Sequence, residues 1–319
     1  MTTDQGAQAA ARLLPVPDDV AGQRIDNFLL TQLKGAPRSL VYRILRSGEV
    51  RVNKGRIKPD YRLQAGDVVR VPPLRLAEAA PAAKPAPGAT RDLANRVVYE
   101  DDALLVLNKP AGLAVHGGSG VAWGVIEALR TLRPEAPFLE LVHRLDRDTS
   151  GLLMIAKKRS LLRELHGHLR EGQMHKVYVA LLMGRLKGAS HRVSAPLKKD
   201  NLPNGERIVR VSSEGKEAIT NFTVLERIGN TTLVEAHIET GRTHQIRVHA
   251  QYLGHPLVGD EKYGNDDFNR QMRAVGINRL FLHARDLKIR ISGHTKPLAL
   301  HCPLEADLEA GLEQLRRAQ

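Results

Sequence analysis

The segment LVHRLDRDTSGLLMIAKK, residues 141–158, places a carboxylate among cationic side chains in a pattern that suits nucleophilic or acid–base chemistry. Asp146 lies between Arg144 and Arg147, ahead of an apolar run at 152–156. A loop that leads into a buried strand can present such side chains to a cleft. Because nearby positive charges favour the ionised carboxylate, Asp146 is a candidate nucleophile or general base.

The same residues also fit a solvated surface turn, because runs of charge usually face water. Asp148, Thr149, Ser150 and Gly151 are turn-forming types, and we interpret Asp148 as a turn residue that bonds nearby backbone amides. A glycoside hydrolase that pairs Asp146 with Asp148 is a further class, which we disfavour. From spacing alone, the surface turn and the reactive carboxylate both stay open.

Apolar patterns around Asp146 predict the elements that must position it. Val234, Ala236 and Ile238 alternate with polar residues, which indicates an antiparallel sheet with one covered face. Apolar runs predict strands at 97–99, 104–107, 152–156, 176–184, 231–239 and 280–289, and helices are predicted at 121–133 and 159–170. We therefore expect an α+β domain over residues 93–319.

An Ala- and Pro-rich stretch at 76–92 divides the chain, because this composition is typical of a semi-rigid linker. Ahead of the linker, residues 16–75 predict a small domain with two short helices, the second opened by Pro37, and strands flanking Lys54 and Gly55. Residues 1–15 show no amphipathic period, and we expect a flexible tail there.

The small domain is strongly basic within a chain whose net charge is +13 and whose pI is about 10.0. Residues 22–72 contain eleven Lys or Arg against four Asp or Glu. Such a field concentrates polyanions, and Arg-rich clusters suit phosphates, although a merely solvated basic surface is the alternative. The candidate RNA-binding residues are Arg38, Arg43 and Arg46 on a helix, and Arg51, Lys54 and Lys58 beside a strand turn.

This small domain resembles the RNA-binding domain first described in small-subunit ribosomal protein S4. The resemblance rests on GQRIDNFL, the Arg38-Ser39 helix start, GEVRVN and LQAGDVV, and it covers about fifty residues. It implies a small α/β S4-like RNA-binding module ahead of the larger domain.

The larger domain resembles the pseudouridine synthase family that modifies large-subunit rRNA and some tRNAs. Its signature is HRLDRDTSG, and three later segments match in order: KVYVAL with Tyr178, GRTHQIRVH with Arg242 and Arg247, and LFLHA with Leu282. The resemblance implies a catalytic fold with a mixed, mainly antiparallel central sheet. It also implies the isomerisation of uridine to pseudouridine in 23S rRNA.

The resemblance implies a role for each motif residue. Asp146 would be the catalytic aspartate, by covalent attack or by a proton abstraction that opens a glycal route. Arg247 would hold Asp146 through a charge-assisted hydrogen bond. Tyr178 would stack on the detached uracil and take the proton from carbon 5, although a strand tyrosine is more often plain core.

The remaining candidates would bind substrate around these three residues. Leu282 would close the apolar side of the pocket, with simple packing as its alternative. Arg144 would fill the space left by a flipped base or contact a phosphate. We interpret His143 and His244 as hydrogen-bonding groups beside the site, and Arg242 as a further substrate contact.

We expect no metal, because the chain has one cysteine, Cys302, and its histidines lack a recognised zinc spacing. We expect no cofactor, because the isomerisation that the resemblance implies gains and loses no atom. No secretory signal or apolar run of roughly 18 residues is present, so we expect a cytoplasmic protein without a membrane span. The expected partner is 23S rRNA or its assembly intermediates, bound by a monomer. A non-catalytic RNA-binding or ribosome-assembly factor is the alternative function.

Overall fold

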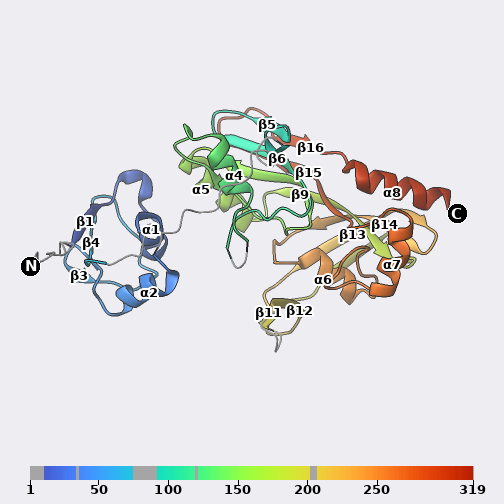
Figure 1. Ribbon diagram of the computed structural model, residues 1–319, viewed down its shortest axis with the longest axis horizontal. Coiled ribbons are helices and arrows are strands. Elements are labelled where there is room, and N and C mark those ends of the chain that lie inside the picture. Colours follow the sequence, from blue (N-terminus) through green and yellow to red (C-terminus); the bar gives the residue numbers. More distant parts are fainter. Residues whose placement is uncertain (1–10, 34–35, 75–91, 119–120, 202–206, 319) are drawn as a thin grey trace, which may run out of the picture. The chain divides into compact units, whose positions relative to one another are not determined.

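The chain folds into two compact units, Met1–Ala82 and Ala83–Gln319. The computed structural model describes residues 11–33, 36–74, 92–118, 121–201 and 207–318 (Figure 1). Each unit has its own sheet and its own buried core. Within the described residues, no helix combines the length and the apolar composition that crossing a bilayer requires.

The first unit packs two helices against a four-stranded sheet of order β1-β4-β2-β3. Its elements are β1 (Arg12–Pro15), a 3-10 turn (Asp18–Val20), α1 (Ile25–Gln32), α2 (Arg38–Arg46), β2 (Arg51–Val52), β3 (Gly55–Arg56) and β4 (Val68–Val71). The helices bury Ile25 and Leu29 from α1 and Ile44 and Leu45 from α2 at helical spacing. The two predicted helices and the strands around the Lys54 turn are confirmed.

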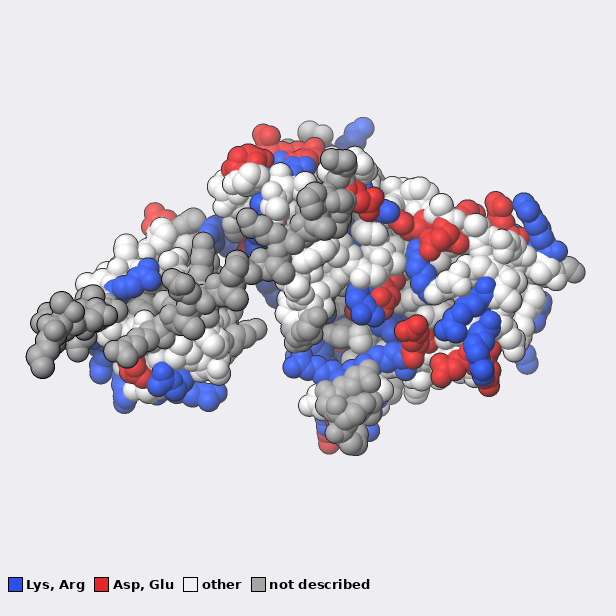
Figure 2. All heavy atoms as spheres, in the orientation of Figure 1, with Lys and Arg blue, Asp and Glu red and all other residues white. Residues whose placement is uncertain are grey.

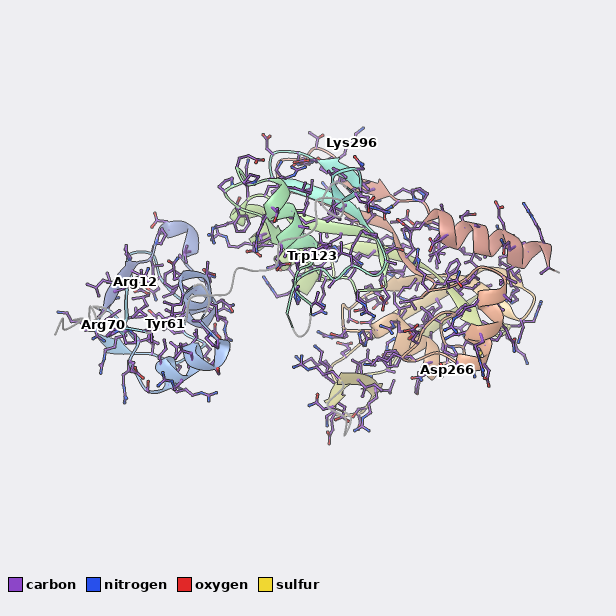
Figure 3. The ribbon with its side chains drawn as sticks, in the orientation of Figure 1. Arg12, Tyr61, Arg70, Trp123, Asp266 and Lys296 are labelled. Atoms are coloured by element: carbon purple, nitrogen blue, oxygen red, sulfur yellow. The ribbon has the colours of Figure 1, made fainter. Side chains whose placement is uncertain are left out.

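One prediction for the first unit is wrong. Residues 12–15, expected in the flexible tail, form strand β1, which pairs antiparallel with β4, so that Leu14 lies opposite Val69. Pairing satisfies backbone groups at the edge of β4, and it brings Val16 into the core at 3% exposure. Arg12 and Arg70 mark these two strands in Figure 3. The rest of the predicted tail, residues 1–10, and most of the predicted linker, 75–91, lie outside the described residues.

The second unit is built on a large sheet whose main order is β10-β13-β14-β9-β15-β8-β6-β5. Its strands are β5 (Val97–Glu100), β6 (Leu104–Lys109), β7 (Glu140–Leu141), β8 (Ser150–Ala156), β9 (His175–Met183), β10 (Ser190–Ser194), β11 (Leu197–Asn201), β12 (Arg207–Val211), β13 (Ile219–Ile228), β14 (Thr231–Ile238), β15 (Leu282–Ile289) and β16 (Leu298–His301). The helices are α4 (Val125–Leu132), α5 (Arg159–Arg170), α6 (Gln245–Tyr252), α7 (Asp266–Ala274) and α8 (Ala306–Arg317). Strands β11 and β12 form a separate hairpin.

The sheet is mixed and mainly antiparallel, as predicted. Strands β8 and β15 run parallel, whereas β9 pairs antiparallel with both β14 and β15. All six predicted strands and both predicted helices of this unit are present, with ends shifted by a few residues. Helices α6, α7 and α8 and strands β7, β10 to β13 and β16 were not predicted.

Buried side chains cover both faces of the large sheet because strand residues alternate in direction. On β9, Tyr178 and Ala180 join the cluster that includes side chains of α4 and α6. The intervening Val179 and Leu181 face the other side, where α7 and α8 pack. Tyr178 therefore belongs to the face of the sheet that α6 covers.

Candidate active site

Asp146 lies in the loop between β7 and β8, and two features fix the shape of this loop. The buried Lys109 at the end of β6 donates from Nζ to the carbonyl oxygens of Pro110, Leu113 and Arg147, at 2.7, 2.8 and 2.9 Å. These bonds use all three donors of the ammonium group. The tether therefore holds the residue that follows Asp146 against the sheet.

Close strand packing fixes the end of the same loop. Gly151 has φ 109°, and a Cβ at this position would lie 2.3 Å from the carbonyl oxygen of Ala284 on β15. Only glycine allows β8 to leave the loop so close to β15. The backbone N–H of Thr149 donates to the Asp146 carbonyl oxygen at 3.2 Å, which closes the turn.

Helix α6 supplies the cationic partners of Asp146. Arg247 Nη1 lies 3.4 Å from Asp146 Oδ2, and His244 Nε2 lies 3.8 Å from the same oxygen. His244 has φ 54°, a left-handed conformation that is uncommon for a non-glycine residue, and it turns the chain into α6. The Asp146 side chain keeps 17% of its surface exposed, so it remains accessible from solvent.

The strongest bonds of Arg247 go to Asp260, a residue that the sequence analysis missed. Arg247 Nε and Nη2 donate to the two Asp260 oxygens at 2.7 and 2.8 Å, a bidentate pair in which the Asp260 side chain is fully buried. Burial alone would raise the pKa of Asp260, but the hydrogen bonds and charge of Arg247 hold it below the usual value. Asp260 thus fixes the guanidinium that faces Asp146.

Tyr263 is the second missed residue, and it orients His244. The Tyr263 hydroxyl accepts from the Val209 N–H at 3.0 Å and lies 2.7 Å from His244 Nδ1. Because that oxygen already accepts a bond, its own proton is available to Nδ1, which favours a His244 tautomer with the proton on Nε2, facing Asp146. Burial, joined by the charge of Arg247, lowers the pKa of His244 despite Asp146. The run VGDEKYG held both missed residues, but nothing in its spacing pointed to α6.

Tyr178 and Leu282 reach the site from neighbouring strands. Ala284 of β15 lies opposite Tyr178 of β9, so Leu282, two residues earlier, points to the same face of the sheet. Burial and then the charge of Asp146 raise the pKa of Tyr178 above its ordinary value, which keeps the phenol protonated. Tyr178 is 7% exposed and Leu282 4% exposed.

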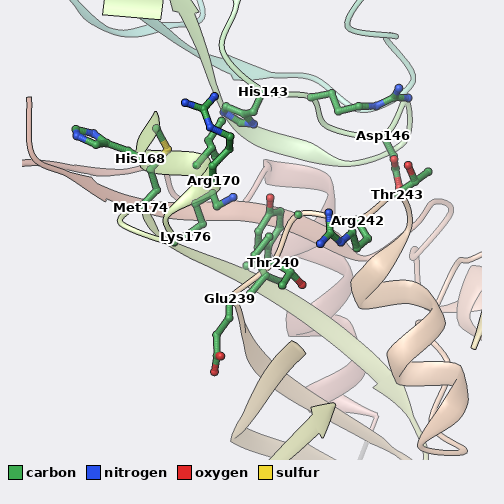
Figure 4. Close-up of a pocket in the computed structure, with 16 residues that line it drawn as sticks. His143, Asp146, His168, Arg170, Met174, Lys176, Glu239, Thr240, Arg242 and Thr243 are labelled. Atoms are coloured by element: carbon green, nitrogen blue, oxygen red, sulfur yellow. The ribbon is translucent and has the colours of Figure 1, made fainter. Parts of the chain in front are cut away.

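A small cavity of about 60 Å³ brings most of the predicted site residues together. Its lining includes Asp146, Tyr178, Arg247, Leu282, Arg144, Arg242 and His244. A larger cavity of about 560 Å³ adjoins it and adds His143, Lys176 and Arg170 (Figure 4). All eight predicted catalytic and substrate-binding residues therefore line one or both of these adjoining cavities, and Asp146 lines both.

One predicted detail differs from the structure. Asp148 pairs with its neighbour Arg147 at 3.0 Å instead of bonding backbone amides, and its side chain is 42% exposed. His143 is a hydrogen-bonding group beside the site, where its Nε2 accepts from the Met154 N–H at 3.2 Å. Burial and the charge of Lys176 lower the pKa of His143 to about 3, so its ring is neutral.

The predicted RNA-binding residues of the first unit are solvent-exposed where the structure describes them. Arg43 and Arg46 lie on α2, Arg51 and Lys54 lie in the β2–β3 hairpin, and Lys58 follows it. None of these five forms an ion pair with a described carboxylate, and Figure 2 shows basic side chains gathered along the α2 side of this unit. The side chain of Arg38 lies outside the described part of the chain.

In the described ranges, no three His, Cys, Asp or Glu side chains lie close enough together to hold a metal ion. The expected lack of a metal and of a cofactor stays a prediction. The site as built offers a carboxylate, two cationic or hydrogen-bonding partners, an aromatic ring and an apolar wall.

Known proteins match both units. The family model for RNA pseudouridylate synthase matches residues 103–252, and the S4 domain model matches residues 23–69. Ribosomal large subunit pseudouridine synthase C of Haemophilus influenzae is 54% identical over 313 residues, which cover 98% of this chain and 97% of that protein. The protein of the same name from Escherichia coli K12 is 56% identical, with 97% and 98% covered.

Solved structures agree with these matches. Human RNA pseudouridylate synthase domain containing 4 has a TM-score of 0.59 and 26% identity over 72% of this chain and 96% of that one. Human RNA pseudouridylate synthase domain containing 1 gives 0.57 and 28%, over 73% and 97%. The predicted fold class and both predicted resemblances are thereby confirmed. The chain belongs to the RNA pseudouridylate synthase family of isomerases, with an S4 domain ahead of the catalytic domain.

Proposed function

We propose that this protein converts uridines of 23S rRNA to pseudouridine as a monomer without a cofactor, with Asp146 as the catalytic carboxylate. One observation carries the proposal: Asp146, Tyr178, Arg247 and Leu282 line the same small cavity although they come from four separate segments. The relatives named above are ribosomal large subunit enzymes, which supports large-subunit rRNA as the substrate.

The reaction needs groups of the kind that surround Asp146. The bond between base N1 and ribose C1′ breaks, the uracil turns while bound, and C5 joins C1′. The C5 proton then leaves and N1 ends protonated, so no atom is gained or lost. Asp146 attacks C1′ or removes a proton from the ribose, and both routes require a carboxylate held in place, which Arg247 and His244 contact from helix α6.

Tyr178 has two roles in this proposal, one for its ring and one for its hydroxyl group. Its ring packs against the detached uracil, and Leu282 completes the apolar wall that retains the free base. Because the pKa of Tyr178 is raised, its phenol removes the C5 proton only if it passes its own proton on in the same step. The carboxylate of Asp146, which lines the same cavity, accepts the phenol proton and then gives a proton to N1 of the uracil, so the proton count is unchanged.

The target base must leave its stack to reach Asp146, at a cost of a few kcal/mol. Arg144, two residues from Asp146, lines three cavities that contain Asp146 and forms no ion pair with a described carboxylate. Its guanidinium is therefore free to occupy the vacated position or to hold the flipped nucleotide. Exposed basic residues of the S4 domain supply further phosphate contacts.

The test uses unmodified 23S rRNA tritiated at C5 of uridine and measures tritium released to water. We expect release by the unaltered protein and none by Asp146→Asn, because the neutral amide can neither attack C1′ nor accept a proton. Both proteins should bind the rRNA equally well in a filter-binding assay.

Asp148→Asn is the matched control, because Asp148 is exposed and paired with Arg147. It should release tritium at close to the unaltered rate. Binding without release by the unaltered protein would instead identify a non-catalytic RNA-binding factor. Free uracil among the products would identify a hydrolase.

A further inference from the structure

The cavity of about 560 Å³ beside Asp146 has an excess of positive charge in its lining. Four cationic side chains line it, Arg144, Arg170, Lys176 and Arg242, against two carboxylates, Asp146 and Glu239. Figure 4 shows Lys176 and Arg242 extending into the same hollow from β9 and from the loop that follows β14. A concave surface with this imbalance attracts anions.

Neither carboxylate neutralises the cavity, because each already has a cationic partner. Glu239 pairs with Arg192 on β10, and Asp146 contacts Arg247. Within the part of the chain that the structure describes, none of the four lining cations forms an ion pair. Arg242 donates from Nε to the Glu217 carbonyl oxygen at 2.9 Å, which leaves its terminal nitrogens for a ligand.

Lys176 is the most buried of these cations. It is partly buried, whereas the other three are exposed, and its Nζ lies beside Gly241, where a Cβ would stand 4.0 Å from it. Lys176 has no hydrogen-bond acceptor among the described residues, and burial lowers its pKa to about 8. A partly buried ammonium group without a partner loses solvation, and a bound anion offsets that cost.

The donors of the cavity indicate the chemistry of its ligand. Lys176, Arg170 and Arg242 offer an ammonium group and two guanidinium groups around one hollow. Cationic N–H donors form their strongest hydrogen bonds with anionic oxygens. These side chains therefore point to a ligand with several oxygen acceptors and negative charge.

We propose that this cavity is a phosphate-binding subsite in which Lys176, Arg170 and Arg242 hold an RNA phosphodiester next to the target uridine. The inference deepens the proposed function and rests on it, because the cavity adjoins Asp146 and the ribose of the target nucleotide is flanked by a phosphate on each side. Binding the backbone there fixes the position of the ribose at Asp146 while the detached base turns. The subsite therefore positions the substrate and takes no part in bond breaking.

The test combines a change in the protein with a change in the RNA. The substrate is a short RNA containing one target uridine mapped in the tritium assay, with a single neutral methylphosphonate linkage either 5′ or 3′ of that uridine. The unaltered protein should lose about 10- to 100-fold in kcat/KM with one of these two linkages, the size expected for losing a charge-assisted hydrogen bond.

Lys176→Met should lower kcat/KM by a similar factor on the all-phosphate RNA. Its kcat/KM should fall little further on the RNA whose methylphosphonate linkage impairs the unaltered protein. Lys176→Arg should recover most of the activity. Lys296→Met is the matched control, because Lys296 is exposed and lies outside the cavity lining, and it should respond to the neutral linkage like the unaltered protein. Arg170→Gln provides a second variant if Lys176→Met does not fold.

If Lys176→Met and the neutral linkage each lower kcat/KM and their losses multiply when combined, the two act independently and the subsite is overturned. Full activity of Lys176→Met on the all-phosphate RNA would also overturn it. Competition by inorganic phosphate without any effect of the neutral linkages would assign the cavity to free phosphate and overturn the RNA contact. If the unaltered protein releases no tritium from the all-phosphate RNA, the proposed function fails instead, which separates the two outcomes.

Discussion

Asp260 is the buried side chain on which the position of Arg247, and through it Asp146, depends. It accepts both bonds of a bidentate guanidinium pair, and it also accepts from the backbone N–H groups of Lys262 and Tyr263 at 2.9 and 3.0 Å. By contrast, Arg247 and Asp146 are 3.4 Å apart. Asp260 therefore restrains the guanidinium and keeps it from closing fully on Asp146, whose carboxylate stays available for the substrate.

Asp260→Asn should lower the free energy of unfolding of the catalytic domain by about 3 to 5 kcal/mol, because it leaves a buried guanidinium without its charge partner. It should also lower kcat more than it raises KM, since Arg247 loses its fixed position beside Asp146. Urea unfolding followed by the fluorescence of Trp123, the single tryptophan, measures the first effect, and tritium release measures the second.

Asp267→Asn is the control for this change, because Asp267 is an exposed carboxylate that pairs with Arg270. Its effect on stability should stay below about 1 kcal/mol, as for other surface ion pairs. Equal effects of the two substitutions would remove the positioning role of Asp260.

At the scale of elements, Glu100 joins three parts of the catalytic domain. Glu100 lies at the end of β5 and forms two ion pairs. One is with Arg133, the C-cap residue of α4, and the other is with Lys157 after β8, whose Nζ lies 2.7 Å from Glu100 Oε1. The hydrogen bond from Arg133, opposed by burial and joined by Lys157, lowers the pKa of Glu100 from 4.5 to about 2. The ion pairs thus stabilise the packing of α4 against the sheet that carries the Asp146 loop.

This lowered pKa predicts a pH-dependent loss of stability for Glu100→Gln. Between about pH 2 and 4.5 the unfolded chain binds the proton and the folded chain does not, so the contribution of Glu100 is complete above pH 4.5 and disappears as the pH falls through 2. We expect the variant to be about 1 to 3 kcal/mol less stable at pH 7 and equally stable near pH 2.

Urea unfolding at several pH values, followed by Trp123 fluorescence, measures this difference. Glu135→Gln is the matched control, because Glu135 is exposed and forms no ion pair with a described residue. A stability difference for Glu100→Gln that does not change with pH would show that the ion pairs are not its cause.

At the scale of the whole molecule, the chain consists of an S4 domain and a catalytic domain, and each carries its own basic side chains. The S4 domain holds five basic side chains exposed and without an ion pair to a described carboxylate, as phosphate contacts require: Arg43, Arg46, Arg51, Lys54 and Lys58. The catalytic domain adds its own basic cavity beside Asp146. We therefore propose that RNA capture and the positioning of the target nucleotide use separate sets of cations.

Replacing Arg43, Arg46, Arg51, Lys54 and Lys58 together by Gln should weaken rRNA binding and flatten its salt dependence. Each lost phosphate contact lowers the slope of log K against log salt by about 0.7 for single-stranded RNA, which gives about 3 to 4 for five contacts. The maximal rate of tritium release at saturating RNA should stay unchanged, because these residues lie outside the catalytic domain.

Filter binding between low and high salt measures that slope. The control neutralises Arg270, Arg316 and Arg317, each of which is already paired with a carboxylate. An unchanged slope in the S4-domain variant would exclude these side chains as phosphate contacts.

The sequence by itself determined the features that depend on local pattern and on motifs. Helical spacing predicted α1 and α2, apolar runs predicted the central strands, and the motif residues Asp146, Tyr178 and Arg247 were identified as site candidates. These features are readable because hydrophobic period and side-chain chemistry act over a few residues. The error at β1 had the opposite cause, because a four-residue edge strand forms only through its partner β4.

Only the tertiary structure decided which distant side chains meet. Asp260 lies 13 residues from Arg247, and Lys176 faces Arg242 across the gap between β9 and a loop after β14. Such contacts follow from strand order, from the parallel pairing of β8 with β15 and from the turn at His244, none of which has a local signal. A charge partner is chosen by the fold, since Coulomb energy depends on distance in space and not on separation along the chain.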